Sequence, residues 1–115
     1  MVFHFDCIFY YVSDLECSIQ FYRDVLGFKF LSRDVVARFD IDGVLFEIAP
    51  APPRHQKPRS GNARLCLRVD DVEAALRDLK AKGVATGGWQ DKSNGVLGSL
   101  EDPDGNEICL WQYRD

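Results

Sequence analysis

The chain has 115 residues, of which 46% are hydrophobic, and its 14 Lys and Arg against 18 Asp and Glu give a net charge of -4. This composition suits one compact core and excludes wholesale disorder. It shows no basic footprint for nucleic acid, no stretch near the roughly 20 apolar residues of a membrane helix and no signal peptide. We therefore expect a cytoplasmic protein with neither nucleic acid nor membrane as a partner, and four free, mostly buried cysteines.

The first elements in chain order are a strand and a helix. Residues 5–12 are apolar, aromatic and β-branched, which predicts a buried strand. Ser13 or Asp14 can cap the helix that follows, because a short side-chain oxygen accepts a free backbone N–H. Gly27 fits the left-handed position after the last turn. The expected apolar stripe of the helix consists of Leu15, Ile19, Tyr22 and Leu26.

Three further strands complete the first module. Residues 28–31 resume an extended pattern, and two alternating segments follow at 35–41 and 44–49. Between these segments stand Asp42 and Gly43, a pair typical of a two-residue hairpin turn with positive φ. The order of elements is therefore predicted to be βαβββ.

The same pattern then returns. Residues 50–62 are rich in proline and basic side chains and predict a linker. At an offset of 57 residues, the matches are Val12 with Val69, Asp14 with Asp71, Glu16 with Glu73, Ile19 with Leu76 and Tyr22 with Leu79. At a later offset of 62, Asp40, Asp42 and Gly43 return as Asp102, Asp104 and Gly105. We therefore predict one α+β domain with two tandem βαβββ modules, residues 1–49 and 63–115.

Three segments make the chain resemble the vicinal oxygen chelate superfamily, the fold of glyoxalase I, the bleomycin-resistance proteins and the extradiol dioxygenases. They are residues 12–16 (VSDLE), 21–28 (FYRDVLGF) and 101–108 (EDPDGNEI). The resemblance implies that each module curls its mixed sheet into a half-barrel and that two modules surround a concave cavity. It also implies a homodimer, with the modules pairing either within one chain or between chains.

The resemblance further implies a metal-ligand position in the first and last strand of each module, usually His, Gln or Glu. Here these positions are Cys7, Glu47, Arg64 and Cys109. Arg64 offers no lone pair and would repel a cation. Neither histidine can replace it: His4 should point to the opposite side of its strand from Cys7, away from the cavity, and His55 lies in the linker. We therefore expect no metal cofactor. Zinc held by the two thiolates and the carboxylate stays open as an alternative.

The predicted hairpin gives Glu47 a different role. If Asp42 and Gly43 form the turn, Arg38 lies opposite Glu47, and with Arg64 nearby the carboxylate is charge-satisfied without a metal. The face packed on the helix should be Phe39, Ile41, Val44, Phe46 and Ile48. The cavity should be lined by Cys7, Phe9, Tyr11, Arg38, Glu47, Arg64, Cys66, Arg68, Cys109 and Trp111. Aromatic side chains with several arginines suit a small aromatic or anionic ligand.

These observations favour a metal-independent small-molecule binding protein of the bleomycin-resistance type. Drug-sequestering relatives use acidic grooves for cationic drugs, whereas this cavity carries arginines. The alternatives are a metal-dependent lyase, isomerase or dioxygenase of the same superfamily, and a non-catalytic regulatory domain; whether any reaction is catalysed stays open. Cys7 and Cys109 are expected to fill space as small hydrophobic residues. A thiol activated by nearby arginines and a disulfide between these two cysteines are the alternatives.

Overall fold

A computed structural model describes residues 1–52 and 61–114 of the chain. The chain divides into two compact units, Met1–Arg59 and Ser60–Asp115. The first contains β1 (Ile8–Val12), α1 (Leu15–Gln20), a π-helical turn η1 (Phe21–Val25), β2 (Lys29–Arg33), β3 (Ala37–Ile41) and β4 (Val44–Pro50). The second contains β5 (Leu65–Arg68), α2 (Val72–Ala81), β6 (Thr86–Lys92), β7 (Gly95–Glu101) and β8 (Glu107–Tyr113).

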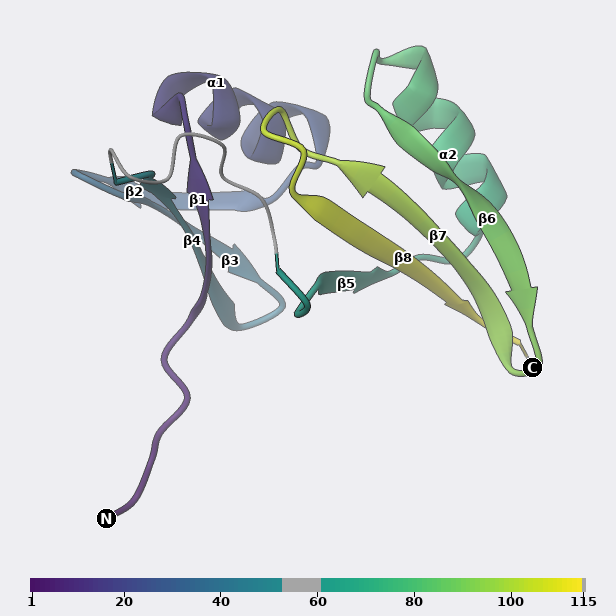
Figure 1. Ribbon diagram of the computed structural model, residues 1–115, viewed down its shortest axis with the longest axis horizontal. Helices are drawn as coiled ribbons and strands as arrows, with labels where there is room; N and C mark the ends of the chain where they lie inside the picture. Colours follow the sequence, from purple (N-terminus) through teal and green to yellow (C-terminus); the bar gives the residue numbers. More distant parts are fainter. Residues whose placement is uncertain (53–60, 115) are drawn as a thin grey trace. The chain divides into compact units, whose positions relative to one another are not determined.

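Each unit is a four-stranded mixed sheet with a helical segment against one face (Figure 1). The strand orders are β1-β4-β3-β2 and β5-β8-β7-β6. In each sheet the first and last strands are parallel neighbours, and the remaining pairs are antiparallel. The predicted α+β class with two βαβββ modules is confirmed, and both sheets are open. No helix among the described residues is long and apolar enough to cross a membrane.

Both helices begin at the predicted caps. The backbone N–H of Cys17 donates to Oδ1 of Asp14 over 3.0 Å. In the second unit, the N–H of Ala74 donates to Oδ1 of Asp71 over the same distance. In both aspartates the backbone is extended, as an N-cap requires. The offset of 57 residues therefore relates two equivalent helix starts.

The first helical segment ends differently from the α-helix that its apolar spacing predicted. The N–H of Leu26 donates to the carbonyl of Phe21, five residues back, over 3.0 Å. This wider π-helical turn accompanies the burial of two consecutive aromatic residues, Phe21 and Tyr22. Gly27 then adopts a φ of 75°, as predicted, and the segment ends.

The core of the first unit is a cluster of aromatic rings. Tyr22 is fully buried, with ring centroids 5.0 Å from Phe46, 5.7 Å from Phe28 and 6.1 Å from Phe39. These contacts tie the helical segment to β3 and β4. Burying rings of this size contributes most of the stability of a small core.

The first hairpin has the predicted turn and register. Asp42 and Gly43 have φ values of 52° and 86°, which the tight turn requires. Arg38 pairs with Glu47 across the ladder, as expected. Phe39 and Phe46 are paired on the buried face.

The second hairpin is wider than the repeat predicted. Strand β7 ends at Glu101 and β8 begins at Glu107, so the turn consists of residues 102–106. The carboxylate of Asp102 organises it, accepting bonds from the N–H groups of Asp104 (2.9 Å) and Asn106 (2.8 Å) and from Nδ2 of Asn106 (2.9 Å). Asp102 and Asn106 are buried here.

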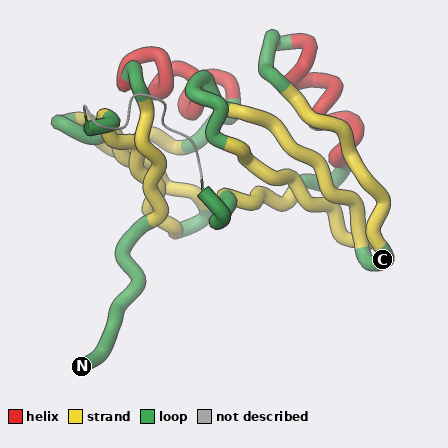
Figure 2. Tube along the Cα trace, in the orientation of Figure 1, coloured by secondary structure: helices red, strands yellow, loops and turns green. Residues whose placement is uncertain are grey.

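The first strand is shorter than predicted. It begins at Ile8 rather than at residue 5, and the preceding chain is irregular (Figure 2). Ile8 pairs with Phe46 on β4, and β4 itself begins at Val44 after the tight turn. In this parallel register Asp6 falls opposite Val44, so the residues before Asp6 run past the start of the partner strand. The prediction that His4 faces away from the cavity assumed that His4 lies in the first strand. It lies outside β1, so strand alternation does not apply to it.

In the second unit, α2 packs closely on β7 at Gly98. A Cβ atom at this position would lie 2.6 Å from Cγ1 of Val72 and 2.9 Å from Cδ1 of Leu76. Both helix residues are buried. Glycine is therefore the residue that allows this helix and strand to make contact.

Candidate functional site

In the first unit, the sheet face opposite the helical segment carries the predicted side chains of β1. Tyr10 and Val12 are buried under the helical segment, whereas Phe9 is 49% exposed. The Phe9 and Tyr11 rings meet edge to face at 5.4 Å. Phe9 pairs with Glu47 on β4.

On β3 and β4, Phe39, Phe46 and Ile48 are buried as predicted. Val44, which was predicted to pack against the helix, is instead 37% exposed because it directly follows the tight turn. The helix-free face carries two aromatic rings beside a carboxylate.

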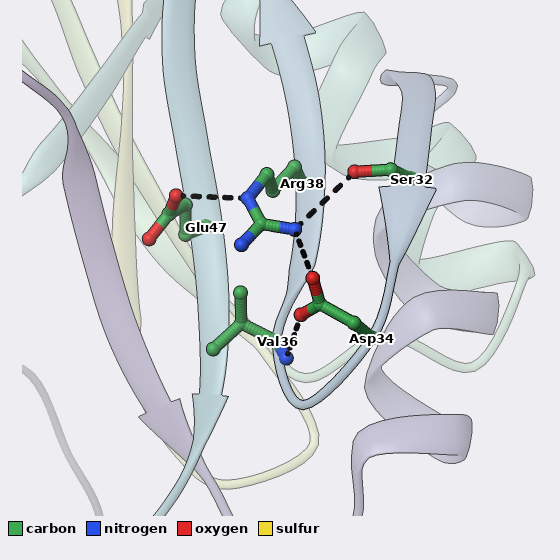
Figure 3. A network of polar contacts seen from close by, with 5 residues as sticks. All are labelled: Ser32, Asp34, Val36, Arg38 and Glu47. Carbon is green, nitrogen blue, oxygen red and sulfur yellow. Dashed lines mark hydrogen bonds and ion pairs between the residues drawn. The ribbon is translucent and has the colours of Figure 1, made fainter.

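Arg38 is the centre of a polar network on the same face (Figure 3). Its Nε lies 3.3 Å from Oε2 of Glu47. Its Nη1 lies 3.0 Å from Oδ2 of Asp34 and donates to Oγ of Ser32 over 3.4 Å. The N–H of Val36 and the Arg38 guanidinium lower the pKa of Asp34. Glu47 is thus paired with Arg38, as the hairpin register predicted.

Cys7 lies just before β1, half-buried. Burial raises the pKa of its thiol, and the nearby carboxylates of Glu47 and Asp6 raise it further. Since the thiolate is the reactive form, this environment opposes an activated Cys7.

In the second unit, the corresponding face is formed by β5, β8 and β7. Cys66 pairs directly with Cys109, and Arg68 pairs with Trp111. Arg64 lies before β5, with Nε 3.5 Å from Oε1 of Glu107. Its Nη1 also donates to the carbonyl oxygens of Gly61 and, over 3.4 Å, Ala63.

The environment of Cys109 opposes the alternative of a thiol activated by a nearby arginine. Arg64 lowers the pKa of this thiol, but burial raises it first and most, followed by Cys66 and Glu107, so the pKa lies above its ordinary value. Burial also raises the pKa of Cys66. All four cysteines are free.

The expectation of mostly buried cysteines was wrong. Cys17 and Cys66 are exposed, and Cys7 and Cys109 are half-buried. The reason is positional: Cys66 and Cys109 alternate with residues that pack under α2, so their thiols lie on the face without a helix. Cys17 lies on the outer side of α1.

A hollow of about 190 Å³ opens on this face of the second unit. It is lined by Gly88 and Gln90 of β6, Leu97, Gly98 and Ser99 of β7, and Glu107 and Cys109 of β8. Of these, the sequence identified only Cys109. Strand parity could have identified Glu107, two residues before Cys109. Strand parity on β7 could also have identified Ser99, which pairs with Cys109. Gln90 lacked such a signal, because the glycine-containing, polar segment of β6 shows no alternation.

The four positions implied for a divalent metal carry a poor set of donors. Cys7 and Glu47 lie in the first unit, where Glu47 is paired with Arg38. Arg64 and Cys109 lie in the second, where Arg64 is a permanent cation. Within neither unit do three or more of the described His, Cys, Asp and Glu side chains gather as metal ligands. These residues do not fit an open divalent site. His55 lies outside the described residues.

Comparisons with known proteins agree with this architecture. The sequence model named Glyoxalase/Bleomycin resistance protein/Dioxygenase superfamily matches residues 4–110. TnmS3, an antibiotic binding protein from Streptomyces sp. CB03234, is 30% identical over 98% of both chains, with a TM-score of 0.78.

A glyoxalase/bleomycin resistance protein from the same Streptomyces strain is 28% identical over 93% of this chain and all of the other, with a TM-score of 0.68. The fosfomycin resistance protein FosX from Listeria monocytogenes shares the fold, with a TM-score of 0.80 at 16% identity over 99% and 96% of the two chains. No curated protein matches the sequence.

Proposed function

We propose that this chain, which belongs to the Glyoxalase/Bleomycin resistance protein/Dioxygenase superfamily, is a binding protein for a small organic molecule. The observation that carries the proposal is the hollow over β6, β7 and β8, with a volume of about 190 Å³. An apolar cavity of about 150 Å³ accepts benzene, so this hollow has room for one substituted ring. The similarity to TnmS3, described as an antibiotic binding protein, supports the same role.

Polar groups in the hollow can orient such a ring. Gln90 offers an amide, Ser99 a hydroxyl and Glu107 a carboxylate, while Leu97 adds apolar surface. Small-molecule sites combine apolar surface with polar groups that fix orientation, and here three polar side chains stand beside Leu97 and Cys109. The hollow therefore combines shape with hydrogen-bonding specificity.

We propose an aromatic or anionic ligand. The charge assignment rests on Arg68, which lines a separate hollow beside Tyr113 rather than the one over β6, β7 and β8. Arg38 and Arg64 are each paired with an acidic side chain. Arg68 is exposed, lies in register with Trp111 and has no ion-pair partner among the described residues. A guanidinium beside an indole suits a planar anion, because it offers both charge and a stacking surface.

We further propose that binding needs no metal. The pairing of Glu47 with Arg38 and the permanent charge of Arg64 support this. Metal analysis of protein purified without chelators tests it, with Glu47→Gln as the comparison. Stoichiometric metal in the wild type that is lost in Glu47→Gln would overturn the proposal in favour of a metal-dependent lyase, isomerase or dioxygenase.

Calorimetric titration with three matched probes tests the ligand class. Benzenesulfonate is aromatic and anionic, cyclohexanesulfonate lacks the aromatic ring, and a phenyl trimethylammonium salt reverses the charge. We expect the first to bind most tightly and Arg68→Gln to weaken it about tenfold, the loss of one charge-assisted contact. Arg77→Gln, an exposed change on α2, is the matched control. Equal affinity for all three probes would contradict the proposal.

We also propose that the two modules, residues 1–49 and 63–115, act as one domain of a cytoplasmic homodimer. Exposed apolar side chains near the start of the chain, among them Phe3 (87%) and Phe5 (74%), favour burial against a second copy. Light scattering measures the mass, and a monomer at micromolar concentration would contradict the dimer. Urea unfolding followed by two spectroscopic probes tests the single domain, which should give one coincident transition.

A further inference from the structure

Two thiols lie side by side on the helix-free face of the second unit. Cys66 of β5 and Cys109 of β8 are directly paired on neighbouring parallel strands (Figure 1). Their chain neighbours Leu65, Ile108 and Leu110 are buried on the opposite face. Cys66 is exposed, Cys109 is half-buried, and both are free. The pair therefore presents two sulfur donors that a solute can reach.

The spacing of the strands suits a bridging ion better than a disulfide. Adjacent strands lie about 4.8 Å apart, and paired side chains on one face start from Cβ atoms at a similar separation. A disulfide needs Cβ atoms about 3.8 Å apart, so the strands would have to move together. An ion with two bonds to sulfur of about 2.3 Å spans up to about 4.6 Å between the sulfur atoms.

We propose that Cys66 and Cys109 together bind one soft monovalent cation of the Cu(I) class. Soft thiolate ligands select Cu(I) and Zn²⁺. Structural Zn²⁺ requires four ligands, whereas a monovalent ion with a filled d shell is satisfied by two sulfur atoms. The pair supplies those two atoms without rearranging the sheet.

Charged groups near the pair act on it in both senses. Two thiolates and one monovalent cation leave a net negative charge, which a nearby cation stabilises. The Arg64 guanidinium acts on Cys109 in this sense, but it is paired with Glu107, and burial, Cys66 and Glu107 together hold the pKa of that thiol above its ordinary value. The site uses neither Cys7 nor Glu47. It shares Cys109 with the four superfamily positions and with the lining of the hollow, and it takes its second donor from Cys66, which belongs to neither.

Competition for Cu(I) tests the pair in the full chain. Reduced protein is titrated under argon against the coloured Cu(I) complex of bathocuproine disulfonate, and native mass spectrometry counts the bound ions. We expect one Cu(I) per chain in the wild type and in the control Cys17→Ser, which removes an exposed single thiol. Cys66→Ser and Cys109→Ser should each lose affinity about 100-fold or more, because the second sulfur no longer binds intramolecularly.

Alkylation of the wild type provides a readout that needs no variant. With one equivalent of Cu(I) bound, iodoacetamide should modify Cys17 and leave Cys66 and Cys109 unmodified, as peptide mass spectrometry would show. Reaction at either Cys66 or Cys109 in the loaded protein would overturn the proposal. Wild-type affinity in Cys66→Ser, or an equal loss in Cys7→Ser, would also overturn it.

Discussion

The two units share a scaffold and differ on the faces that could meet a ligand. In the first, Phe9, Glu47 and Arg38 lie in one row across β1, β4 and β3. In the second, the corresponding row across β5, β8 and β7 is Cys66, Cys109 and Ser99. A charged, aromatic row thus corresponds to a row of thiols and a hydroxyl. The repeat preserves what the backbone needs and leaves the helix-free face free to vary.

The helices show a second difference, and it carries the largest expected effect on stability. Tyr22 is fully buried among three rings, whereas its counterpart Leu79 is only half-buried. We expect Tyr22→Ala to lower the free energy of unfolding by about 4 kcal/mol and Leu79→Ala by about 2 kcal/mol. Urea denaturation measures both. Equal losses would mean that the aromatic cluster does not dominate the first core.

The two hairpin aspartates should also separate the units. In Asp102→Ala, two N–H groups and a buried amide lose their acceptor, so we expect a loss of about 3 kcal/mol in unfolding free energy. The matched change is Asp40→Ala, whose carboxylate accepts a bond from Gly43 over 3.1 Å. It should cost about 1 kcal/mol or less. Thermal unfolding of the two variants side by side would show whether the wider turn is the more demanding one.

At the helix caps the units should behave alike. Asp14→Ala and Asp71→Ala each remove one bond of 3.0 Å to a backbone N–H. Each should cost about 1 kcal/mol, and the double variant about the sum, because distant sites add. Chemical denaturation tests this equality. A difference well above the error would indicate that the repeated caps support unequal helices.

The smallest effect concerns Arg38 and pH. The folded state lowers the pKa of Asp34 through Val36 and Arg38. This contribution to stability is present above the unfolded pKa of Asp34 and is lost as pH falls through the folded value. In Arg38→Gln we expect the Asp34 pKa, followed by NMR, to rise towards its ordinary value. Arg77→Gln should leave it unchanged, and no movement in Arg38→Gln would show that Val36 alone sets the shift.

What could be predicted from the sequence was mostly local. The caps at Asp14 and Asp71 and the turn at Asp42 follow from single side chains acting on nearby backbone, and the register of Arg38 with Glu47 follows from that turn. The wider second turn could not be predicted by analogy, because it depends on how the Asp102 carboxylate is buried.

The candidate site could be predicted only in part. Alternation on β1 and β4 correctly grouped Phe9 with Glu47. The hollow needs Gln90 and Ser99 from strands joined by a turn, and the register of β6 shifts between Thr86 and Trp89. Such a shift changes which side chains share a face. The spacing of residue types along the sequence gives no sign of this register shift.

At Gly98 the sheet of the second unit is a single layer of backbone with a neighbour on each side. One side faces Val72 and Leu76 of α2, and the other contributes to the floor of the hollow. A change that displaces α2 therefore reaches the hollow without passing through any ligand contact. One residue thus belongs both to the packed core of the second unit and to the lining of the hollow.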